Sequence, residues 1–266
     1  MNYRYKLGFL GAGNMAKAIA RGIIKSNILN KDEIIMSDPF VEGEVAGIKV
    51  INDNKVIFND CEHVLLAVKP QVFEQIVDSL SEVKVQKVIS IMAGVKMAKI
   101  KDVIKDAQVI RIMPNLPASV GVGMAGIAKD NNGDENFNNF VKAIFDSAGD
   151  SIFVNESDLD AVTAISGSGP AYVYYFIQSM IKAGIKNGLT EEQAKRLTLQ
   201  TFVGAVEMVK NSNEDLDTMI DRVCSKGGTT IQAIDTFRGY DLESKIIEGI
   251  DKCKNRSEEL SKWWKK

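Results

Sequence analysis

A glycine-rich segment near the amino terminus constrains the fold more than any other part of the sequence. It reads Gly8-Phe9-Leu10-Gly11-Ala12-Gly13-Asn14-Met15-Ala16 and lies between a short apolar run and an amphipathic stretch. In a G-x-G-x-x-A turn from strand to helix, the first glycine permits the tight turn and the second lets the backbone approach a phosphate. The small Ala16 lets the helix pack closely on the strand. The segment predicts a dinucleotide site with its pyrophosphate at the helix amino terminus.

The candidate cofactor residues in this turn are Gly11, Ala12, Gly13, Asn14 and Met15. A glycine pattern alone can also mark a purely structural turn. The segments that follow favour the dinucleotide interpretation, because β-type runs alternate with helix-length stretches up to about residue 155. Such alternation is typical of βαβ units.

The β-type runs are continuously apolar, as strands buried on both faces of a parallel sheet should be. They are Lys6–Leu10, Ile34–Ser37, Val64–Val68, Lys87–Met92, Gln108–Met113, Val122–Ala128 and Ser151–Val154. Helices are expected between them, at Asn14–Ser26, Gln71–Ser81 and Asn136–Ser147. We therefore predict an α/β fold in which residues 1–156 form a Rossmann-type, doubly wound parallel sheet.

Past residue 156 the β signal stops, and capped helical segments follow. The sequence Thr190-Glu191-Glu192-Gln193 is a capping box that opens a helix ending near Lys210. The other expected helices are Pro170–Lys186, Leu216–Val223, Thr229–Phe237 and Asp241–Trp264. Residues 157–266 are thus predicted to form a second, all-α domain.

The composition excludes several classes of site. A formal charge of −2 offers no cation excess for nucleic acid, and no apolar run is long enough to span a membrane. The one histidine, His63, is expected in a loop or at a strand edge. One histidine also disfavours metal centres and Ser-His-Asp triads, so no metal site is expected. Three widely separated cysteines favour a reducing, cytoplasmic setting.

The end of the second predicted strand bears on the choice between NADH and NADPH. A carboxylate there accepts a hydrogen bond from the ribose 2′-hydroxyl, whereas a cation favours the 2′-phosphate. Asp38 follows Ser37 at this place, and no Lys or Arg follows within the turn. Asp38 in this role predicts a pocket that tolerates NAD. The alternative is that Asp38 only forms a turn with Pro39 while Ser37 binds phosphate, and both interpretations stay open.

Two proline-containing turns follow buried strands, within Val64–Gln71 and Arg111–Pro117. Ligands of open α/β sheets bind outside the carboxyl ends of the strands. Fixed turns there can hold a nicotinamide ring, although prolines can also simply end strands. The candidate cofactor residues in these turns are Ala67, Val68, Lys69, Pro70, Met113 and Asn115.

In the helical half, the segment Val223–Ile231 is the one whose composition most favours a binding site over a purely structural role. It contains Gly227-Gly228 and several hydroxyl side chains directly before a predicted helix. Unpaired N–H groups at the positive end of a helix form a seat for a small carboxylate. The alternative is a plain N-cap by Thr229. A similar break, Ser166–Pro170, is explained as well by close helix packing.

Taken together, these motifs strongly resemble those of the pyrroline-5-carboxylate reductase family, over essentially the whole chain. The resemblance is carried by Phe9–Ala16, Ala67–Pro70, Met113–Ala118, Ser166–Val173 and Cys224–Ile231. It implies reduction of 1-pyrroline-5-carboxylate to L-proline by NADPH or NADH, which is the last step of proline biosynthesis. It also implies a carboxyl-terminal dimerisation domain, commonly a decamer, and an active site shared between the Rossmann domain of one subunit and helices of its partners.

The resemblance assigns further roles to individual residues. Ser37, Asn54 and Asn115 correspond to cofactor contacts, beside the glycine turn and the residues from Ala67 to Pro70. Substrate binding falls on Ser225, Gly227, Gly228, Thr229 and Thr230, and the Thr230 hydroxyl faces the ring nitrogen as the candidate catalytic group. Two departures are present. Lys226 replaces the usual proline, and Asp215-Leu216 replaces the usual His-Pro.

Two other functions remain as alternatives. A β-hydroxyacid dehydrogenase would need a general acid, and Lys182 lies on a predicted helix, although within a different motif. A nucleotide-sensing or assembly protein could keep the fold after losing catalysis. The presence of Ser225, Gly227, Gly228 and Thr230 speaks against that second alternative.

Overall fold

The computed structural model describes residues 3–77, 83, 85–130 and 133–262. Its chain divides into two compact units. The first, here called the sheet unit, comprises residues 1–168 and 253–266. The second, here called the helical unit, comprises residues 169–252.

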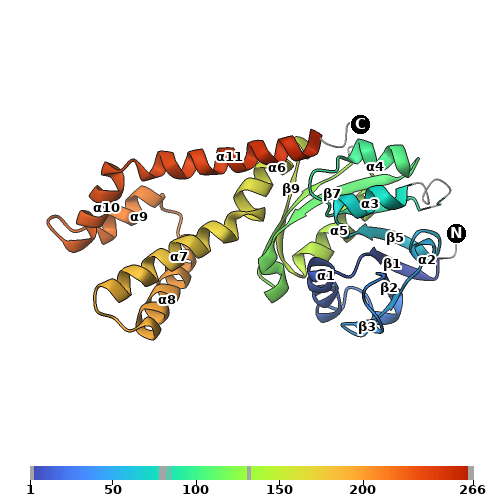
Figure 1. Ribbon diagram of the computed structural model, residues 1–266, viewed down its shortest axis with the longest axis horizontal. Helices are drawn as coiled ribbons and strands as arrows, with labels where there is room; N and C mark the ends of the chain where they lie inside the picture. The colour runs from blue at the N-terminus through green and yellow to red at the C-terminus, as the bar shows by residue number, and fades with distance from the viewer. Residues whose placement is uncertain (1–2, 78–82, 84, 131–132, 263–266) are drawn as a thin grey trace. The chain divides into compact units, whose positions relative to one another are not determined.

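The described part of the sheet unit contains a nine-stranded sheet with the order β3-β4-β2-β1-β5-β6-β7-β8-β9 (Figure 1). The strands are β1 (Tyr5–Leu10), β2 (Ile34–Ser37), β3 (Glu44–Val45), β4 (Ile48–Ile51), β5 (Cys61–Leu66), β6 (Lys87–Ser90), β7 (Gln108–Pro114), β8 (Gly123–Ala128) and β9 (Gly149–Val154). The run from β4 to β7 is parallel, as predicted. The pairs β3–β4 and β7–β8 are antiparallel, so the prediction of a wholly parallel sheet is wrong at these two places.

Helices cover both faces of the sheet, because its strands send alternate side chains into two apolar cores. The helices are α1 (Asn14–Lys25), α2 (Asn54–Asp60), α3 (Pro70–Ile76), α4 (Met97–Val103), α5 (Glu135–Asp146) and α6 (Leu159–Val162). One core takes Phe9 and Leu65 from the sheet and packs them against α1 and α5. The other takes Leu10 and Leu66 and packs them against α2, α3 and α4. The Rossmann-type doubly wound fold is thereby confirmed.

His63 does not lie in a loop or at a strand edge, and that expectation is wrong. It lies in β5, which pairs with β1 and β6, and its side chain is buried. The ring stacks on Phe137, and its Nδ1 lies 2.9 Å from the Lys6 carbonyl oxygen. Burial lowers the pKa of His63, so the folded chain favours the neutral ring. The imidazole is therefore part of the core.

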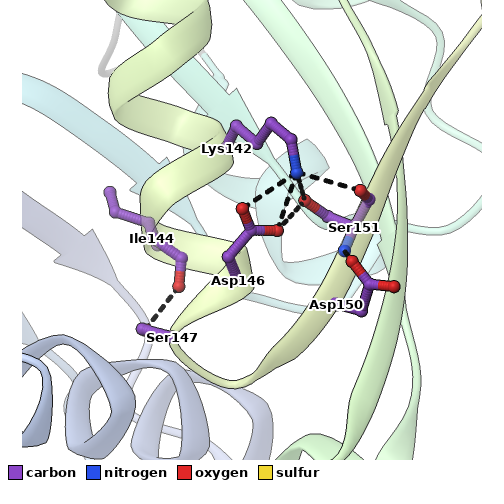
Figure 2. A network of polar contacts seen from close by, with 6 residues as sticks. All are labelled: Lys142, Ile144, Asp146, Ser147, Asp150 and Ser151. Carbon is purple, nitrogen blue, oxygen red and sulfur yellow. Dashed lines mark hydrogen bonds and ion pairs between the residues drawn. The ribbon is translucent and has the colours of Figure 1, made fainter.

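The edge strand β9 is held to α5 by a polar network (Figure 2). The Lys142 ammonium donates to both carboxylate oxygens of Asp146, at 3.0 and 2.8 Å, and to the Ser151 carbonyl at 3.1 Å. The Ser151 hydroxyl in turn donates to Asp146 Oδ1 at 2.5 Å. Ser151 is buried, so these bonds hold β9 against α5 at a position that is closed to solvent.

The helical unit contains α7 (Gly169–Lys186), α8 (Glu191–Lys210), α9 (Leu216–Val223), α10 (Thr229–Gly239) and the first part of α11 (Leu242–Lys262). The predicted capping box opens α8: the Thr190 hydroxyl accepts from the Gln193 N–H at 3.2 Å, and the Gln193 side chain accepts from the Thr190 N–H. No helix of the described residues is long and apolar enough to cross a membrane.

Two predicted helices extend beyond the described residues. The helix predicted over Gln71–Ser81 begins at Pro70 and is described to Ile76, while residues 78–82 lie outside the described part. The end of the predicted helix Asp241–Trp264 also lies outside it, from residue 263 onward. The short elements β3, β4, α2 and α4 were not predicted from the sequence.

The compact units do not coincide with the predicted division after residue 156. Residues 157–168 stay with the sheet, because Leu159 of α6 belongs to its second core and the π-helix Thr163–Gly167 follows directly. The end of α11 also stays with the sheet unit, where Ser257 donates to Asp160 at 2.6 Å. The division at residue 156 remains a prediction about domains.

Candidate active site

The glycine turn lies at the carboxyl end of β1, and its first glycine is required by the backbone. Gly11 has φ of +101°, and a Cβ atom there would lie 2.8 Å from the Ala67 carbonyl oxygen. The Gly11 N–H donates to the Ser37 carbonyl at 2.8 Å, and the Ala67 N–H donates to the Leu10 carbonyl at 2.8 Å. These bonds join the turn to the ends of β2 and β5.

The amino terminus of α1 is free to meet an anion. Gly13 is its N-cap, no side chain caps it, and its first turn holds no acidic residue. A Cβ atom on Gly13 would meet nothing within 4 Å, so open space lies over the turn. The first N–H groups of a helix carry partial positive charge. The uncapped start of α1, with Asn14 and Met15 as its first residues, therefore fits the pyrophosphate of a dinucleotide. The open space at Gly13 lets the phosphate approach the backbone.

The end of β2 carries Ser37 and Asp38 beside this turn. The Ser37 hydroxyl donates to Asn54 Oδ1 at 2.7 Å and is buried. Asp38 Oδ2 accepts from the Ala12 N–H at 2.8 Å, and its Oδ1 accepts from the Phe40 N–H at 2.9 Å. Asp38 thus bonds to the glycine turn itself as well as to its own turn, a contact that the sequence analysis did not predict.

The ends of β5 and β7 complete this edge of the sheet. Ala67 and Val68 follow β5, Lys69 is the N-cap of α3, and Pro70 is its first residue. Because β1, β2, β5 and β7 are parallel members of one sheet, their carboxyl ends share an edge. The structure therefore brings the predicted cofactor residues together on this edge, within the sheet unit.

Met113 and Asn115, at the end of β7, also contact the segment that leads toward the helical unit. The Asn115 amide donates to the Ser166 carbonyl at 3.1 Å and accepts from the Met124 N–H at 2.8 Å. A Cβ atom on Gly167 would lie 2.6 Å from the Met113 methyl carbon. The Asn115 side chain therefore positions the π-helix and β8 as well as bordering the edge, and its predicted contact with cofactor stays a prediction.

Strand β6 lies between β5 and β7, and the residues that follow it were given no predicted role. The Ile91 N–H donates to the Leu66 carbonyl at 3.2 Å, which binds this turn to the end of β5. Ala93 is exposed directly after the buried Met92. Their place after a buried strand was the signal that could have marked them as part of the same edge.

The predicted carboxylate seat is a loop between α9 and α10 in the helical unit. Gly227 has φ of +73°, and Gly228, not Thr229, is the N-cap of α10. The alternative of a plain N-cap by Thr229 is therefore wrong. No side chain caps α10, and its first turn holds no acidic residue. Its first N–H groups can thus serve an anion.

Ser225 lies directly over this helix terminus. Its carbonyl accepts from the Gly228 N–H at 2.9 Å, and a Cβ atom on Gly228 would lie 2.3 Å from the Ser225 hydroxyl oxygen. A side chain at residue 228 would therefore displace that hydroxyl. Thr230, the second residue of α10, is half-buried, while Ser225 is exposed. The loop brings the Ser225 hydroxyl, the uncapped start of α10 and the Thr230 hydroxyl into one short segment.

The two departures from the family pattern have plain structural consequences. Lys226 is exposed in the loop, where it adds a cation beside the seat. Asp215 is the N-cap of α9, and its carboxylate accepts from both the N–H and the hydroxyl of Thr218, at 2.8 and 2.9 Å. The Thr218 N–H holds the pKa of Asp215 below its usual range. Asp215 therefore supplies the cap at the start of α9.

Comparison with known proteins covers nearly the whole chain. A family described as "Pyrroline-5-carboxylate reductase dimerisation" matches residues 156–260, and one described as "NADP oxidoreductase coenzyme F420-dependent" matches residues 6–94. The chain is 38% identical to a Synechocystis pyrroline-5-carboxylate reductase over 97% of its own length and 98% of the relative's.

Two solved structures are similar throughout. The Plasmodium falciparum pyrroline carboxylate reductase with NADP bound has a TM-score of 0.86 and 32% identity, covering 98% of this chain and all of that one. The Coxiella burnetii pyrroline-5-carboxylate reductase has a TM-score of 0.85 and 32% identity, covering 97% and 98% of the two chains. The resemblance deduced from the motifs thus extends to sequence and fold alike.

Proposed function

Because the chain belongs to the pyrroline-5-carboxylate reductase family, we propose that it reduces 1-pyrroline-5-carboxylate to L-proline with NADPH or NADH, the last step of proline biosynthesis. The observation that carries the proposal is that one chain holds two open helix amino termini of different kinds. One follows the glycine turn of a Rossmann-type sheet, and the other follows the Ser225–Gly228 loop. The first suits a dinucleotide and the second suits a small carboxylate.

The sheet unit binds the cofactor in this proposal. Gly11 and Gly13 admit the pyrophosphate to the start of α1, and the turns after β5 and β7 border the nicotinamide. The bound cofactor supplies a hydride from its C4 atom. The residues of the edge bind and orient it, and Pro70 fixes the backbone that follows Lys69.

The helical unit binds the substrate. Ser225 and the backbone of Gly228 and Thr229 receive its carboxylate, and Gly227 provides the left-handed turn that the loop needs. The Thr230 hydroxyl hydrogen-bonds the ring nitrogen. A protonated imine is strongly electrophilic at carbon, so the protein mainly orients the two reactants, an effect worth up to about 7–11 kcal/mol.

Neither alternative function has comparable support. The buried His63 is not placed as an acid, and imine reduction does not require one, since water or substrate can supply the proton. Lys182, the general acid that a hydroxyacid dehydrogenase would need, donates to Gln178 of its own helix at 3.3 Å. The presence of Ser225, Gly227, Gly228 and Thr230 argues against a protein that lost catalysis.

The chain carries the family's dimerisation domain, and we propose that the dimers assemble into a decamer in the cytoplasm. Support for a partner comes from the helical unit, where large apolar side chains such as Tyr175, Val203 and Tyr240 are more than half exposed. Many large apolar side chains left exposed on one unit favour an interface with another protein. The three free cysteines suit a reducing compartment.

The test is an assay of purified protein with 1-pyrroline-5-carboxylate and NADH or NADPH, in which cofactor oxidation and L-proline are measured together. We expect one proline for each cofactor oxidised. Thr230→Ala should lower kcat/KM, while the control Thr236→Ala, whose hydroxyl bonds only within α10, should not. Ser225→Ala should raise KM for the imine more than KM for the cofactor. Cofactor oxidation with a keto acid and none with the imine would refute the proposal.

A further inference from the structure

The end of β2 holds the Asp38 carboxylate in a fixed place on the glycine turn. We propose that Asp38 makes the chain selective for NADH over NADPH. This inference rests on the proposed function, because it concerns the cofactor site of the same reaction. It concerns a choice that the sequence pattern alone left open.

The position of Asp38 is set by two hydrogen bonds at once. Its Oδ2 accepts from the Ala12 N–H at 2.8 Å, and its Oδ1 accepts from the Phe40 N–H at 2.9 Å. The side chain is half-buried, so it is not a freely moving surface carboxylate. In a Rossmann-type site the ribose next to the adenine lies where β2 ends beside this turn. A carboxylate there accepts from the 2′-hydroxyl of NADH and repels the 2′-phosphate of NADPH.

The opposing possibility was that Ser37 binds the 2′-phosphate. A serine hydroxyl has one proton to donate. The Ser37 hydroxyl already donates it to Asn54 Oδ1 at 2.7 Å, and only 2% of the Ser37 surface is exposed. Ser37 therefore ties the end of β2 to the start of α2 and offers no donor to a phosphate.

The charges around the end of β2 point the same way. The segment Ile34–Ile48 contains the acidic residues Asp38, Glu42 and Glu44 and no lysine or arginine. Lys49 lies opposite Glu44 in the β3–β4 register. A 2′-phosphate carries between about −1.5 and −2 charges, as other phosphate monoesters do at neutral pH. It would meet net negative charge here.

Lys55 could attract a 2′-phosphate, since it is a cation in the first turn of α2 at the same edge of the sheet. The residue before Asn54, Asp53, is the N-cap of that helix, and its carboxylate accepts from the Lys55 N–H at 2.9 Å. A negative charge thus lies two residues before Lys55, on the carboxylate that accepts from its N–H. The experiment separates the two effects, because only the Asp38 account predicts a change when the Asp38 charge is removed.

Equilibrium titration of the enzyme with NADH and with NADPH, followed by the fluorescence of the reduced nicotinamide, tests the proposal without turnover. We expect NADH to bind at least about tenfold more tightly than NADPH, because the Asp38 carboxylate repels the 2′-phosphate. Asp38→Asn keeps an oxygen acceptor and removes the charge, and should cut this ratio about tenfold. The control Glu42→Gln should change it less than about twofold.

Equal binding of the two cofactors by the wild-type enzyme would overturn the proposal, as would an unchanged ratio in a folded Asp38→Asn enzyme. Should that variant fail to fold, the wild-type ratio and that of Asp38→Glu, which keeps the charge and should keep the preference, decide the question. Failure of the proposed function gives a different result. The binding ratio would persist while neither cofactor supported formation of L-proline.

Discussion

The two compact units bury their side chains to very different extents. The sheet unit has an apolar core on each face of its sheet, with many side chains fully buried. In residues 169–252, all of which are described, only Ala194 and Thr198 are buried. A segment of that length with no core of its own needs another surface to cover its apolar side chains. The sheet unit is thus complete by itself, whereas the helical unit depends on a second copy of the chain.

The largest effect on stability is expected from a substitution in the glycine turn of the sheet unit. Gly11→Ala would place a Cβ atom 2.8 Å from a carbonyl oxygen at φ of +101°, so we expect a loss of about 3 kcal/mol or more of unfolding free energy. The matched variant Gly13→Ala meets open space. It should stay within about 1 kcal/mol of wild type while its cofactor affinity falls. Urea denaturation and cofactor titration measure both, and a stable Gly11→Ala enzyme would contradict the account.

A nearly equal effect is expected from a buried charge in the sheet unit. Glu156 Oε1 accepts from Arg111, at 2.8 Å, and from the Met97 N–H, at 2.7 Å, and the Arg111 side chain is 9% exposed. Glu156→Ala leaves that guanidinium unpaired, so we expect a loss of about 3 kcal/mol in urea denaturation. The helical unit offers the control Lys252→Ala, which breaks an exposed pair with Glu248 and should cost less than about 1 kcal/mol. Similar losses of unfolding free energy in the two variants would contradict the difference between the buried pair and the exposed pair.

A smaller effect is expected from a charge placed on the uncovered face of the helical unit. Tyr175 is 69% exposed and lines an apolar groove of about 440 Å³ between α7 and α11. Tyr175→Glu should weaken the dimer by about 2 kcal/mol, roughly thirtyfold in Kd, because aromatic side chains dominate such interfaces. Analytical ultracentrifugation measures this change. The control Val72→Glu, at an exposed apolar residue of α3, should leave the dimer intact. An unaffected Tyr175→Glu dimer would mean that another surface joins the subunits.

The smallest effect concerns pH and belongs to the sheet unit alone, because His63 is the one histidine of the chain. Burial lowers its pKa from the usual 6.5, while the unfolded chain binds a proton near that value. The unfolded state therefore holds more protons as the pH falls through 6.5, and stability decreases. Nearby Glu62, Lys6 and Lys87 act on the same ring.

Between about pH 7.5 and 5.5, the wild type should lose up to about 1 kcal/mol more than His63→Gln, which keeps a donor for the Lys6 carbonyl. Urea denaturation at the two pH values gives the comparison. Identical pH dependence in the two proteins would show that His63 does not sense pH through its burial.

The parts of the fold that follow from local pattern could be predicted from the sequence. Apolar runs located β1, β2 and β6, and the box at Thr190 located the start of α8, because these signals lie within a few residues. The strand β3 was missed because Glu44–Val45 is too short to show a period. The direction of β8 was missed because periodicity contains no information about direction. His63 was misplaced because the polar pair Glu62-His63 conceals the start of a central strand.

The candidate site divides in the same way. Glycines at Gly11 and Gly227 revealed backbone conformations that few other residues adopt, and these were predictable. Two hydrogen bonds of the site could not be predicted from the sequence, because each joins residues that lie far apart in the chain. The bond between Asp38 and Ala12 spans 26 positions, and the bond between Asn115 and Ser166 spans 51. Such contacts depend on how the strands are ordered in the sheet. The residues of the candidate site could therefore be predicted from the sequence, whereas their hydrogen-bond partners could not.

In the proposed reaction, hydride passes from a nicotinamide cofactor to the imine carbon of 1-pyrroline-5-carboxylate. The most direct measurement uses NADH deuterated at both C4 positions and analyses the product by mass spectrometry and NMR. We predict L-proline with a single deuterium, located on the ring carbon that was double-bonded to nitrogen. Unlabelled proline, deuterium at another carbon or oxidised cofactor without proline would contradict the account.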